Sequence, residues 1–145
     1  MPFDTSDAQA KDDALCAAIG DMTPAMEASV LVVADGIEAN FRSESSAGDP
    51  WEQLAASTVA ERMRKGYGPA HPILNRESVL KNVASAHRVA NASGAEVGSD
   101  DSIPYARAQA DGYGNIPARD FLAQTSLTID AIDRAIQDHL ERNDG

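Results

Sequence analysis

Three histidines and one cysteine are the residues of this chain whose types could hold a metal ion or act as nucleophiles. His71, His87 and His139 are far apart, without the i, i+4 spacing or the accompanying cysteines of a zinc site. Cys16 is the single cysteine, so the chain has neither an intramolecular disulfide nor a cluster of thiolate ligands. These residues predict no metal site and no cofactor. The histidines are better explained as a turn residue, a strand surface residue and an exposed helix residue, in that order.

The motifs of nucleophilic and phosphate-binding enzymes are missing as well. No Gly-x-Ser-x-Gly turn occurs, although serine, histidine and aspartate are all present, and a Ser-His-Asp triad stays open on residue types alone. The Gly-Tyr-Gly at 66–68 lacks the Lys-Ser/Thr pair and the helix that complete a phosphate loop. The aspartate pairs at 12–13 and 100–101 are adjacent in sequence, so their side chains diverge on a helix and favour capping or solvation. We therefore expect no catalytic residues, and favour an interaction protein over an enzyme.

The composition is that of one modest globular domain. The chain has 145 residues, of which 43% are hydrophobic, but many of these are alanine and only seven residues are aromatic. Alanine buries little apolar area, so the core is expected to be thin, with contacts between subunits adding to the stability. We expect a single domain over residues 1–145, with flexible ends at 1–6 and 143–145.

The formal net charge of -11 is unevenly distributed along the chain. Residues 1–61 carry about a dozen acids against Lys11 and Arg42, residues 62–119 have a net positive charge, and the tail is acidic again. Two explanations stay open: a solvated acidic protein, or a surface whose basic part meets an acidic face of a neighbouring copy. Non-specific binding to nucleic acid is disfavoured, because phosphates repel an acidic body.

The N-terminal segment predicts synthesis in the cytosol, without a signal peptide or membrane contact. It is rich in aspartate and has neither a basic n-region nor an apolar h-region. The longest apolar run, residues 30–34, is far shorter than a membrane span.

Helical patterns dominate both ends of the chain. A weak helical pattern covers residues 7–19. A strong helical pattern begins after Thr23, the expected N-cap, and ends near Arg42. Pro24 occupies the first helical position. The apolar stripe of the second pattern has helical spacing throughout and is widened by two further residues: Met26, Val30, Val33, Ile37, Phe41, with Leu31 and Ala34. Thr125 or Ser126 is expected to cap the C-terminal helix, whose apolar stripe is Ile129, Ile132, Ile136 and Leu140.

The middle of the chain predicts shorter elements. A polar loop covers residues 43–50, and a short helix over 59–65 carries Arg62, Arg64 and Lys65 in its last turn, where positive charge suits the helix dipole. An extended piece is expected at 71–74, a helical turn at 78–83, and one or two helical turns at 105–110. Alternating segments at 83–89 and 95–97, separated by the turn at 91–94, predict a β-hairpin. We therefore expect an α+β fold: a small antiparallel sheet packed with two N-terminal helices, short connecting helices and a C-terminal helix.

A segment that we call the corner, residues 116–122, is the most distinctive local sequence. It reads Ile-Pro-Ala-Arg-Asp-Phe-Leu and follows a glycine-rich turn at 111–115. Pro117 fixes its own φ and biases Ile116 toward an extended conformation, which indicates a rigid bend before the last helix. We expect Phe121 and Leu122 to hold this bend against the core. Arg119 would then point outward or against a neighbouring backbone, the alternative being an arginine that binds carbonyls within its own subunit.

The order of features along the chain resembles the bacteriophage virion-morphogenesis family, the Mu-like tail-completion proteins. The resemblance covers roughly residues 24–142 and rests on an ordered set of short sequence pieces. The corner and the amphipathic C-terminal helix complete this set. The pieces before the corner are Trp51, Leu54, Ser57, Thr58, Arg64, Lys65, Pro72, Ile73, Leu74, Leu80, Val97, Gly98, Ser99, Tyr105, Ala106 and Gly112. The chain departs from the family pattern before Leu80, after Ala106 and at Asp120, where the family usually has Thr-Gly, His-Gln and proline.

The resemblance implies a structural protein of the virion, located at the neck or tail and made in the host cytoplasm. Such a tail terminator or tail-completion protein forms a ring, commonly a homohexamer, that contacts the tail tube protein and a head-closure or connector protein. DNA passes through its lumen without sequence-specific binding. A head-closure or adaptor ring is the alternative, and an enzyme of unknown class comes third. The expected subunit interface comprises residues of the corner and of the basic middle: Arg119, Phe121, Leu122, Tyr105, Arg64 and Lys65.

Overall fold

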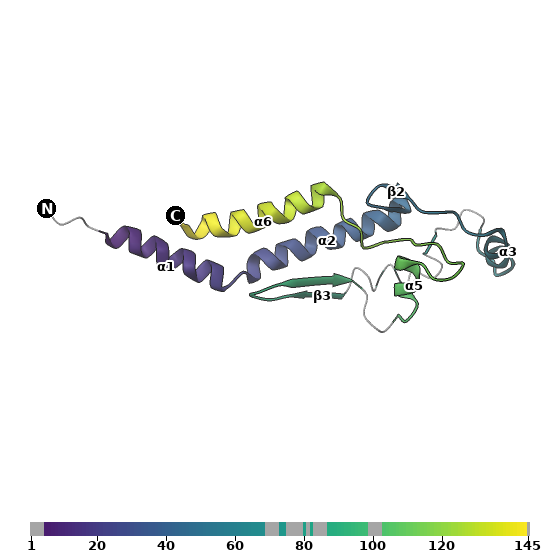
Figure 1. Cartoon of the computed structure of the whole chain (residues 1–145), viewed down its shortest axis with the longest axis horizontal. Helices are drawn as coiled ribbons and strands as arrows, with labels where there is room; N and C mark the ends of the chain where they lie inside the picture. The colour runs from purple at the N-terminus through teal and green to yellow at the C-terminus, as the bar shows by residue number, and fades with distance from the viewer. Residues whose placement is uncertain are drawn as a thin grey trace.

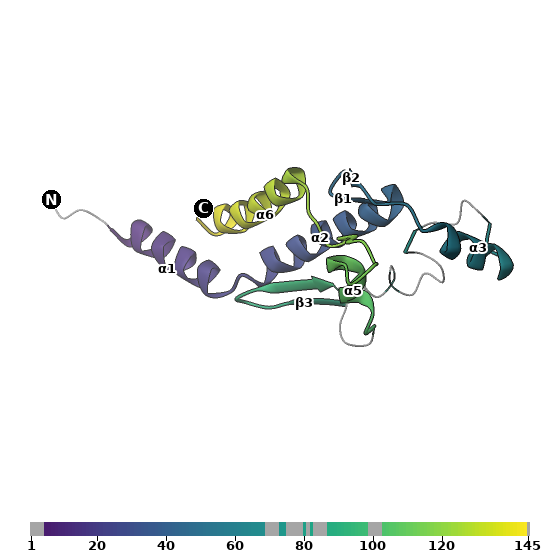
Figure 2. The same cartoon turned by 45° about the vertical axis from the view of Figure 1, so that its right-hand side comes forward.

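The polypeptide forms an elongated body around one long central helix. The computed structural model describes residues 5–68, 73–74, 80, 82, 87–98 and 103–144. Helix α2 (Thr23–Ser43) is central, with α6 (Ser126–Asp144) along one side and the hairpin of β3 (His87–Ala90) and β4 (Ala95–Gly98) along the other (Figures 1 and 2). The predicted α+β class, with a small antiparallel sheet, is confirmed.

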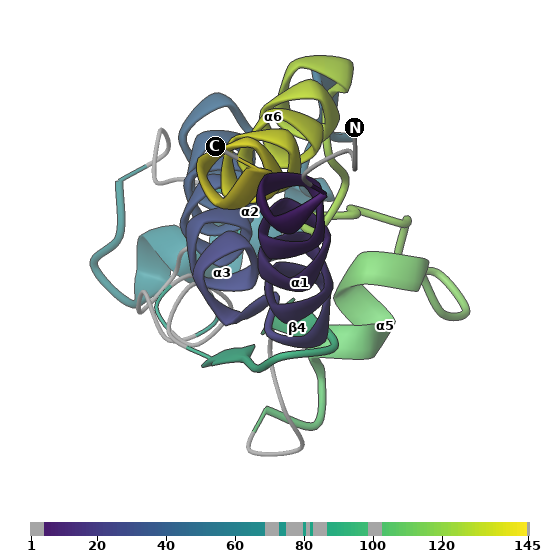
Figure 3. The same cartoon turned by 90° about the vertical axis from the view of Figure 1, so that its left-hand side faces the viewer.

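Two further helices occupy the opposite ends of the long axis. α1 (Ser6–Gly20) extends beyond the N-terminal end of α2, and α3 (Ala56–Arg64) lies beyond the other end (Figures 1 and 2). Seen along this axis from the α1 end, α6 lies above the hairpin with α1 and α2 between them (Figure 3). No single helix among the described residues is long and apolar enough to cross a membrane, and the pair α1–α2, bent by 46°, meets that criterion by length and composition only.

The start of α2 differs from the expected capping arrangement. Thr23 is the first helical residue, and Met22 occupies the cap position without a side-chain hydrogen bond, so the prediction of Thr23 as N-cap is wrong. The Asp21 carboxylate instead accepts the Thr23 N–H at 3.1 Å. Pro24 lies in the first turn, where the missing N–H has no helical acceptor. Asp21, the residue before the cap position, therefore supplies the side-chain hydrogen bond that an N-cap residue usually provides.

α2 buries one face along its whole length. The buried residues follow helical spacing: Ala25, Ser29, Val30, Ala34, Ile37, Asn40 and Phe41. Leu31, which was expected to widen the buried stripe, is 56% exposed, because its position on the helix lies away from α6, the hairpin and the core. Met26 and Val33 are only half-buried at the edges of the face.

A short hairpin, with two residues in each strand, follows α2 at the position where the sequence predicted a polar loop. β1 (Ser45–Ser46) pairs with β2 (Asp49–Pro50), and Ala47 and Gly48 between them both have positive φ, at 50° and 101°. Positive φ at both central residues suits the tight turns that connect adjacent strands. The Trp51 N–H then donates to the Glu44 carbonyl at 2.8 Å, which returns the chain to the end of α2.

The later elements agree with the expected order. β3 and β4 pair antiparallel, with Ala90 opposite Ala95 and His87 opposite Gly98. The Asn91 carboxamide oxygen accepts the N–H groups of Ser93 and Gly94 and closes the turn. The earlier part of the predicted first strand, residues 83–86, lies outside the described residues.

Two connecting segments are only partly described. Of the extended piece expected at 71–74, residues 73–74 form a turn in which Leu74 has a φ of 57°. Of the helical turn expected at 78–83, residues 80 and 82 are helical. The short helix predicted at 105–110 is α5 (Ala106–Asp111).

α6 is held to the joint between α1 and α2 by a histidine. The His139 Nε2 lies 3.1 Å from the Ala18 carbonyl oxygen and 2.9 Å from that of Asp21. Both partners are acceptors, so Nε2 carries the hydrogen and His139 is not the exposed residue that the sequence suggested. Residues 143 and 144, expected as a frayed end, belong to the last turn of α6.

The core is concentrated where α2 ends and the corner passes. Its buried residues come from α2, the loop after β2, α5, the corner and three connecting positions (73, 80 and 103): Ile37, Phe41, Trp51, Ile73, Leu80, Ile103, Ala106, Ala110 and Phe121. The Phe41 ring packs edge-on against Trp51, with 5.7 Å between ring centroids, and in a tilted arrangement against Phe121, with 5.3 Å between centroids. The three aromatic rings thus join segments that are about 80 residues apart in the sequence.

Candidate functional site

The corner begins as a tight turn packed against the end of α5. Tyr113 and Ile116 exchange backbone hydrogen bonds of 3.0 Å and 2.8 Å. Gly112 has a φ of 78°, and a Cβ built there would lie 2.9 Å from the Ala118 nitrogen and 3.0 Å from the Ile116 oxygen. Only glycine fits at this position without displacing the backbone that follows.

Arg119 is bound to the backbone of its own chain. Its N–H donates to the Gln109 carbonyl at 2.8 Å, and its guanidinium donates to the Glu52 carbonyl at 3.0 Å from Nε and 2.8 Å from Nη2. A longer contact of 3.3 Å reaches the Gln53 carbonyl. The residue is 4% exposed, so the expectation that its side chain points outward is wrong, and the alternative of carbonyl binding within the subunit is found.

The reason for this arrangement is the irregular chain after β2. Glu52 and Gln53 belong to no helix or strand, and the Arg119 guanidinium satisfies both of their carbonyls at once. Burial lowers the pKa of Arg119, with the Glu52 carboxylate raising it and nearby Arg62 lowering it. The guanidinium stays charged throughout the physiological range, because arginine starts from a very high value.

Phe121 lies in the core, whereas Leu122 lies at the surface. Phe121 is fully buried among the core aromatics, as the expected anchor of the bend. Leu122 is 37% exposed and lies next to Gly98 at the end of β4. Phe121 therefore contributes to an interface only by positioning the chain, whereas Leu122 has surface available for contact.

Asn40 holds the segment after the corner, and sequence reasoning missed it. Its Nδ2 donates to the carbonyls of Phe121 at 2.9 Å and Ala123 at 2.7 Å, and its Oδ1 accepts the Ala47 N–H at 3.0 Å. One buried carboxamide thus connects α2, the β1–β2 turn and the approach to α6. The available signal was a polar residue at a position where the apolar stripe of α2 continues, between Ile37 and Phe41.

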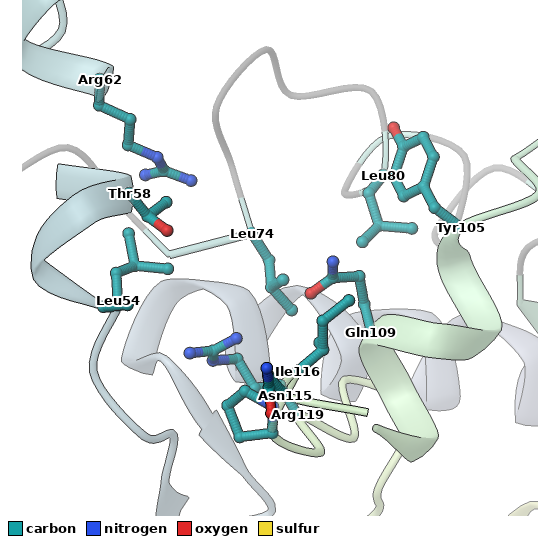
Figure 4. Close-up of a pocket in the computed structure, with 12 residues that line it drawn as sticks. Leu54, Thr58, Arg62, Leu74, Leu80, Tyr105, Gln109, Asn115, Ile116 and Arg119 are labelled. Carbon is teal, nitrogen blue, oxygen red and sulfur yellow. The ribbon is translucent and has the colours of Figure 1, made fainter. Parts of the chain in front are cut away.

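A cavity of about 520 Å³ opens between the corner, α3 and α5 (Figure 4). Part of its described wall is apolar: Leu54, Leu74, Leu80, Ile116 and Pro117. The rest, apart from Ala55, is polar or aromatic and includes two guanidiniums: Thr58, Arg62, Tyr105, Gln109, Asn115 and Arg119. Tyr105 is half-exposed, and Arg62 is 8% exposed.

The basic residues at the end of α3 point to different sides of the helix. Arg62 turns inward and lines the cavity, whereas Arg64 is exposed on the outer side of the helix. Lys65 pairs with Glu61 at 2.6 Å across one helical turn. Of the six predicted interface residues, Arg64, Lys65, Tyr105 and Leu122 therefore reach the surface, while Arg119 and Phe121 are buried.

The described wall of the cavity carries side chains that could contact another molecule. In the part of the chain that the structure describes, no three His, Cys, Asp or Glu side chains gather where they could hold a metal ion. The described cavity wall combines leucine and isoleucine side chains with guanidinium and carboxamide groups, which suits an apolar or acidic protein surface. His71 lies outside the described residues. Searches against family models, curated proteins and solved structures find no match.

Proposed function

We propose that this chain is a structural protein of a phage neck or tail end: a ring-forming tail terminator or tail-completion protein that ends the tail tube and joins tail to head. The observation that carries this proposal is that the separate sequence pieces of the family resemblance meet in one structural unit. Trp51, Leu80, Ala106 and Phe121 are members of a single buried cluster.

Other pieces of the resemblance adjoin that cluster. Leu54, Leu74 and Val97 pack against it as partly buried residues. Gly112 permits the close return of the chain into the corner, and Gly98 lies beside Leu122. A fold signature requires its apolar residues to meet in one core, and these residues meet that requirement.

The chemistry and shape of the chain also favour assembly over catalysis. A ring of identical subunits needs two different and complementary faces on each copy. The elongated body and the uneven charge distribution supply two distinct ends. The overall acidic charge also suits a channel for DNA, because a wall that repels phosphate lets the duplex pass without binding it.

The proposal is tested first on purified particles and then on the isolated protein. We expect the chain in virions at a constant copy number divisible by six, and a ring with a central hole in electron micrographs of the isolated protein. Antibody labelling at the junction of head and tail separates the terminator from the alternative head-closure or adaptor ring. Catalytic turnover by a protein that is absent from particles would overturn both structural assignments.

A further inference from the structure

We propose that helix α1 of one copy docks on the α3 end of the next copy, with the cavity beside α3 as part of the contact. The inference rests on the proposed ring and names the surfaces that build it. It is drawn from the exposure, charge and position of these two ends of the molecule.

α1 offers a long face that its own chain leaves uncovered. Ala18 is the one buried residue of this helix, and Ala14 and Leu15 beside it are partly buried toward α6. At 3.6 residues per turn, Asp12, Asp13 and Cys16 fall on the opposite half of the helix, and all three are exposed. A helix that buries so little within its own subunit gains stability from a partner.

The outer face of α1, the half that carries Asp12, Asp13 and Cys16, remains acidic when the ion pair and the hydrogen bond within the helix are counted. Lys11 lies 3.7 Å from Asp7 one turn away, which offsets one negative charge. Asp13 accepts a hydrogen bond of 2.9 Å from the neutral Gln9 side chain and keeps its charge. Asp12 and Asp13 therefore give this face two negative charges.

The α3 end has the opposite charge and an apolar component. Lys65 is paired with Glu61, which leaves Arg64 as the exposed charge on the outer side of the helix. Met63 next to it is 54% exposed. Behind this helix, the guanidiniums of Arg62 and Arg119 both line the cavity (Figure 4).

The positions of the two ends make the contact heterologous. α1 and α3 lie at opposite ends of the long axis, so α1 cannot reach the α3 end of its own subunit (Figures 1 and 2). A symmetric pair joined through two α1 helices, or through two α3 helices, would bring like charges together. Joining α1 to α3 brings opposite charges together and repeats from copy to copy, as a ring requires.

Cys16 allows a direct test, because it is the single cysteine and is exposed on the proposed contact face. A maleimide photo-crosslinker is attached to Cys16 of unlabelled protein, which is mixed with 15N-labelled protein, irradiated and digested. We expect crosslinks from Cys16 to 15N-labelled peptides that contain residues 56–65. Crosslinks between copies that fall on α1, α2 or α6 instead would overturn the proposed contact.

Charge exchange tests the same contact without a chemical label. Asp12→Lys with Asp13→Lys should weaken self-association at least about tenfold, and so should Arg64→Glu. Mixing the two variants should restore association, because each then supplies the complementary charge. Glu96→Lys with Asp130→Lys is the matched control for the double variant, and Arg42→Glu is the matched control for Arg64→Glu, since these residues are exposed and lie outside α1 and α3.

The outcomes also distinguish this inference from the proposed function. A wild-type chain that stays monomeric at high concentration and is absent from particles contradicts both. A wild-type ring that forms equally well with all of the charge variants contradicts the α1–α3 contact and leaves the ring intact. Circular dichroism and thermal melting of each variant confirm that the charge changes leave the fold in place.

Discussion

At the scale of single residues, Asn40 satisfies more of the buried backbone than any side chain suggested by the sequence. Its carboxamide uses both donor hydrogens and its oxygen on three backbone groups from two other segments. The partners lie in loops, where no helix or strand supplies an alternative partner. Loss of this side chain therefore leaves several polar groups unpaired at once.

Asn40→Ala is expected to destabilise the protein by about 2–4 kcal/mol, because each buried group left without a partner costs about 1–3 kcal/mol. Urea unfolding followed by circular dichroism measures the change. Asn143→Ala serves as the control, since Asn143 is exposed and bonds only to the His139 carbonyl of its own helix. Equal losses for the two variants would show that Asn40 does not hold these loops.

The capping aspartate between α1 and α2 predicts a specific dependence on pH. Hydrogen bonds from the Thr23 side chain and backbone lower the pKa of Asp21 below its ordinary value. An aspartate with a lowered pKa stabilises the fold above its unfolded pKa of about 3.9, and this contribution is lost as the pH falls through the lower folded value.

Asp21→Asn should therefore be less stable than the wild type at neutral pH, because it lacks the charge at the helix N-terminus. The difference should stay constant above about pH 5 and shrink below about pH 4. Urea titrations of both proteins across this range measure it. A difference that is independent of pH would mean that the Asp21 charge does not stabilise α2.

At the scale of elements, the corner depends on the close return of the chain after α5. Gly112 and Gly114 are two residues apart and both have positive φ, at 78° and 56°. They differ in their surroundings, since a Cβ at Gly112 meets backbone atoms and a Cβ at Gly114 meets nothing within 4 Å. This pair separates the cost of backbone strain from the cost of steric overlap.

Gly114→Ala should cost about 1 kcal/mol, the strain of an alanine at positive φ. Gly112→Ala should cost at least about 2 kcal/mol more, because the backbone of the corner must also move. Thermal unfolding of the two variants gives the comparison. If Gly112→Ala is no worse than Gly114→Ala, the tight packing of the corner on α5 is incorrect.

The elements were more predictable from the sequence than their contacts. The apolar period of α2 and the turn at 91–94 are local signals, so the central helix and the hairpin were predicted correctly. The inward turn of Arg62 and the carbonyl contacts of Arg119 depend on segments more than forty residues away. Residue types and local spacing carry no information on such partners, which is why the sequence left the orientation of Arg119 open between two alternatives and did not predict the inward turn of Arg62.

At the scale of the whole molecule, both the thin core and the two charged ends favour self-association. The buried cluster gathers near one end of α2, while α1 at the other end buries little against its own chain. The acidic α1 face and the basic α3 end would both repel a copy of themselves. An assembly that joins them brings opposite charges together and adds stability to α1.

This arrangement predicts that self-association weakens as salt is added. The screening length falls from about 10 Å at 0.1 M ionic strength to about 3 Å at 1 M, so attraction between exposed charges is largely lost. We expect the apparent Kd of assembly, measured by sedimentation velocity, to rise at least about tenfold between about 0.05 M and about 0.5 M sodium chloride.

The equimolar mixture of the Asp12→Lys/Asp13→Lys variant with Arg64→Glu should show the same salt dependence, because its attraction is also between opposite charges. An interface dominated by apolar burial behaves in the opposite way, since strongly hydrated salts such as sulfate strengthen it. Association that is constant or tighter at high salt would therefore place the contact on the exposed apolar residues, such as Leu127 and Tyr113, and not on the α1 and α3 ends.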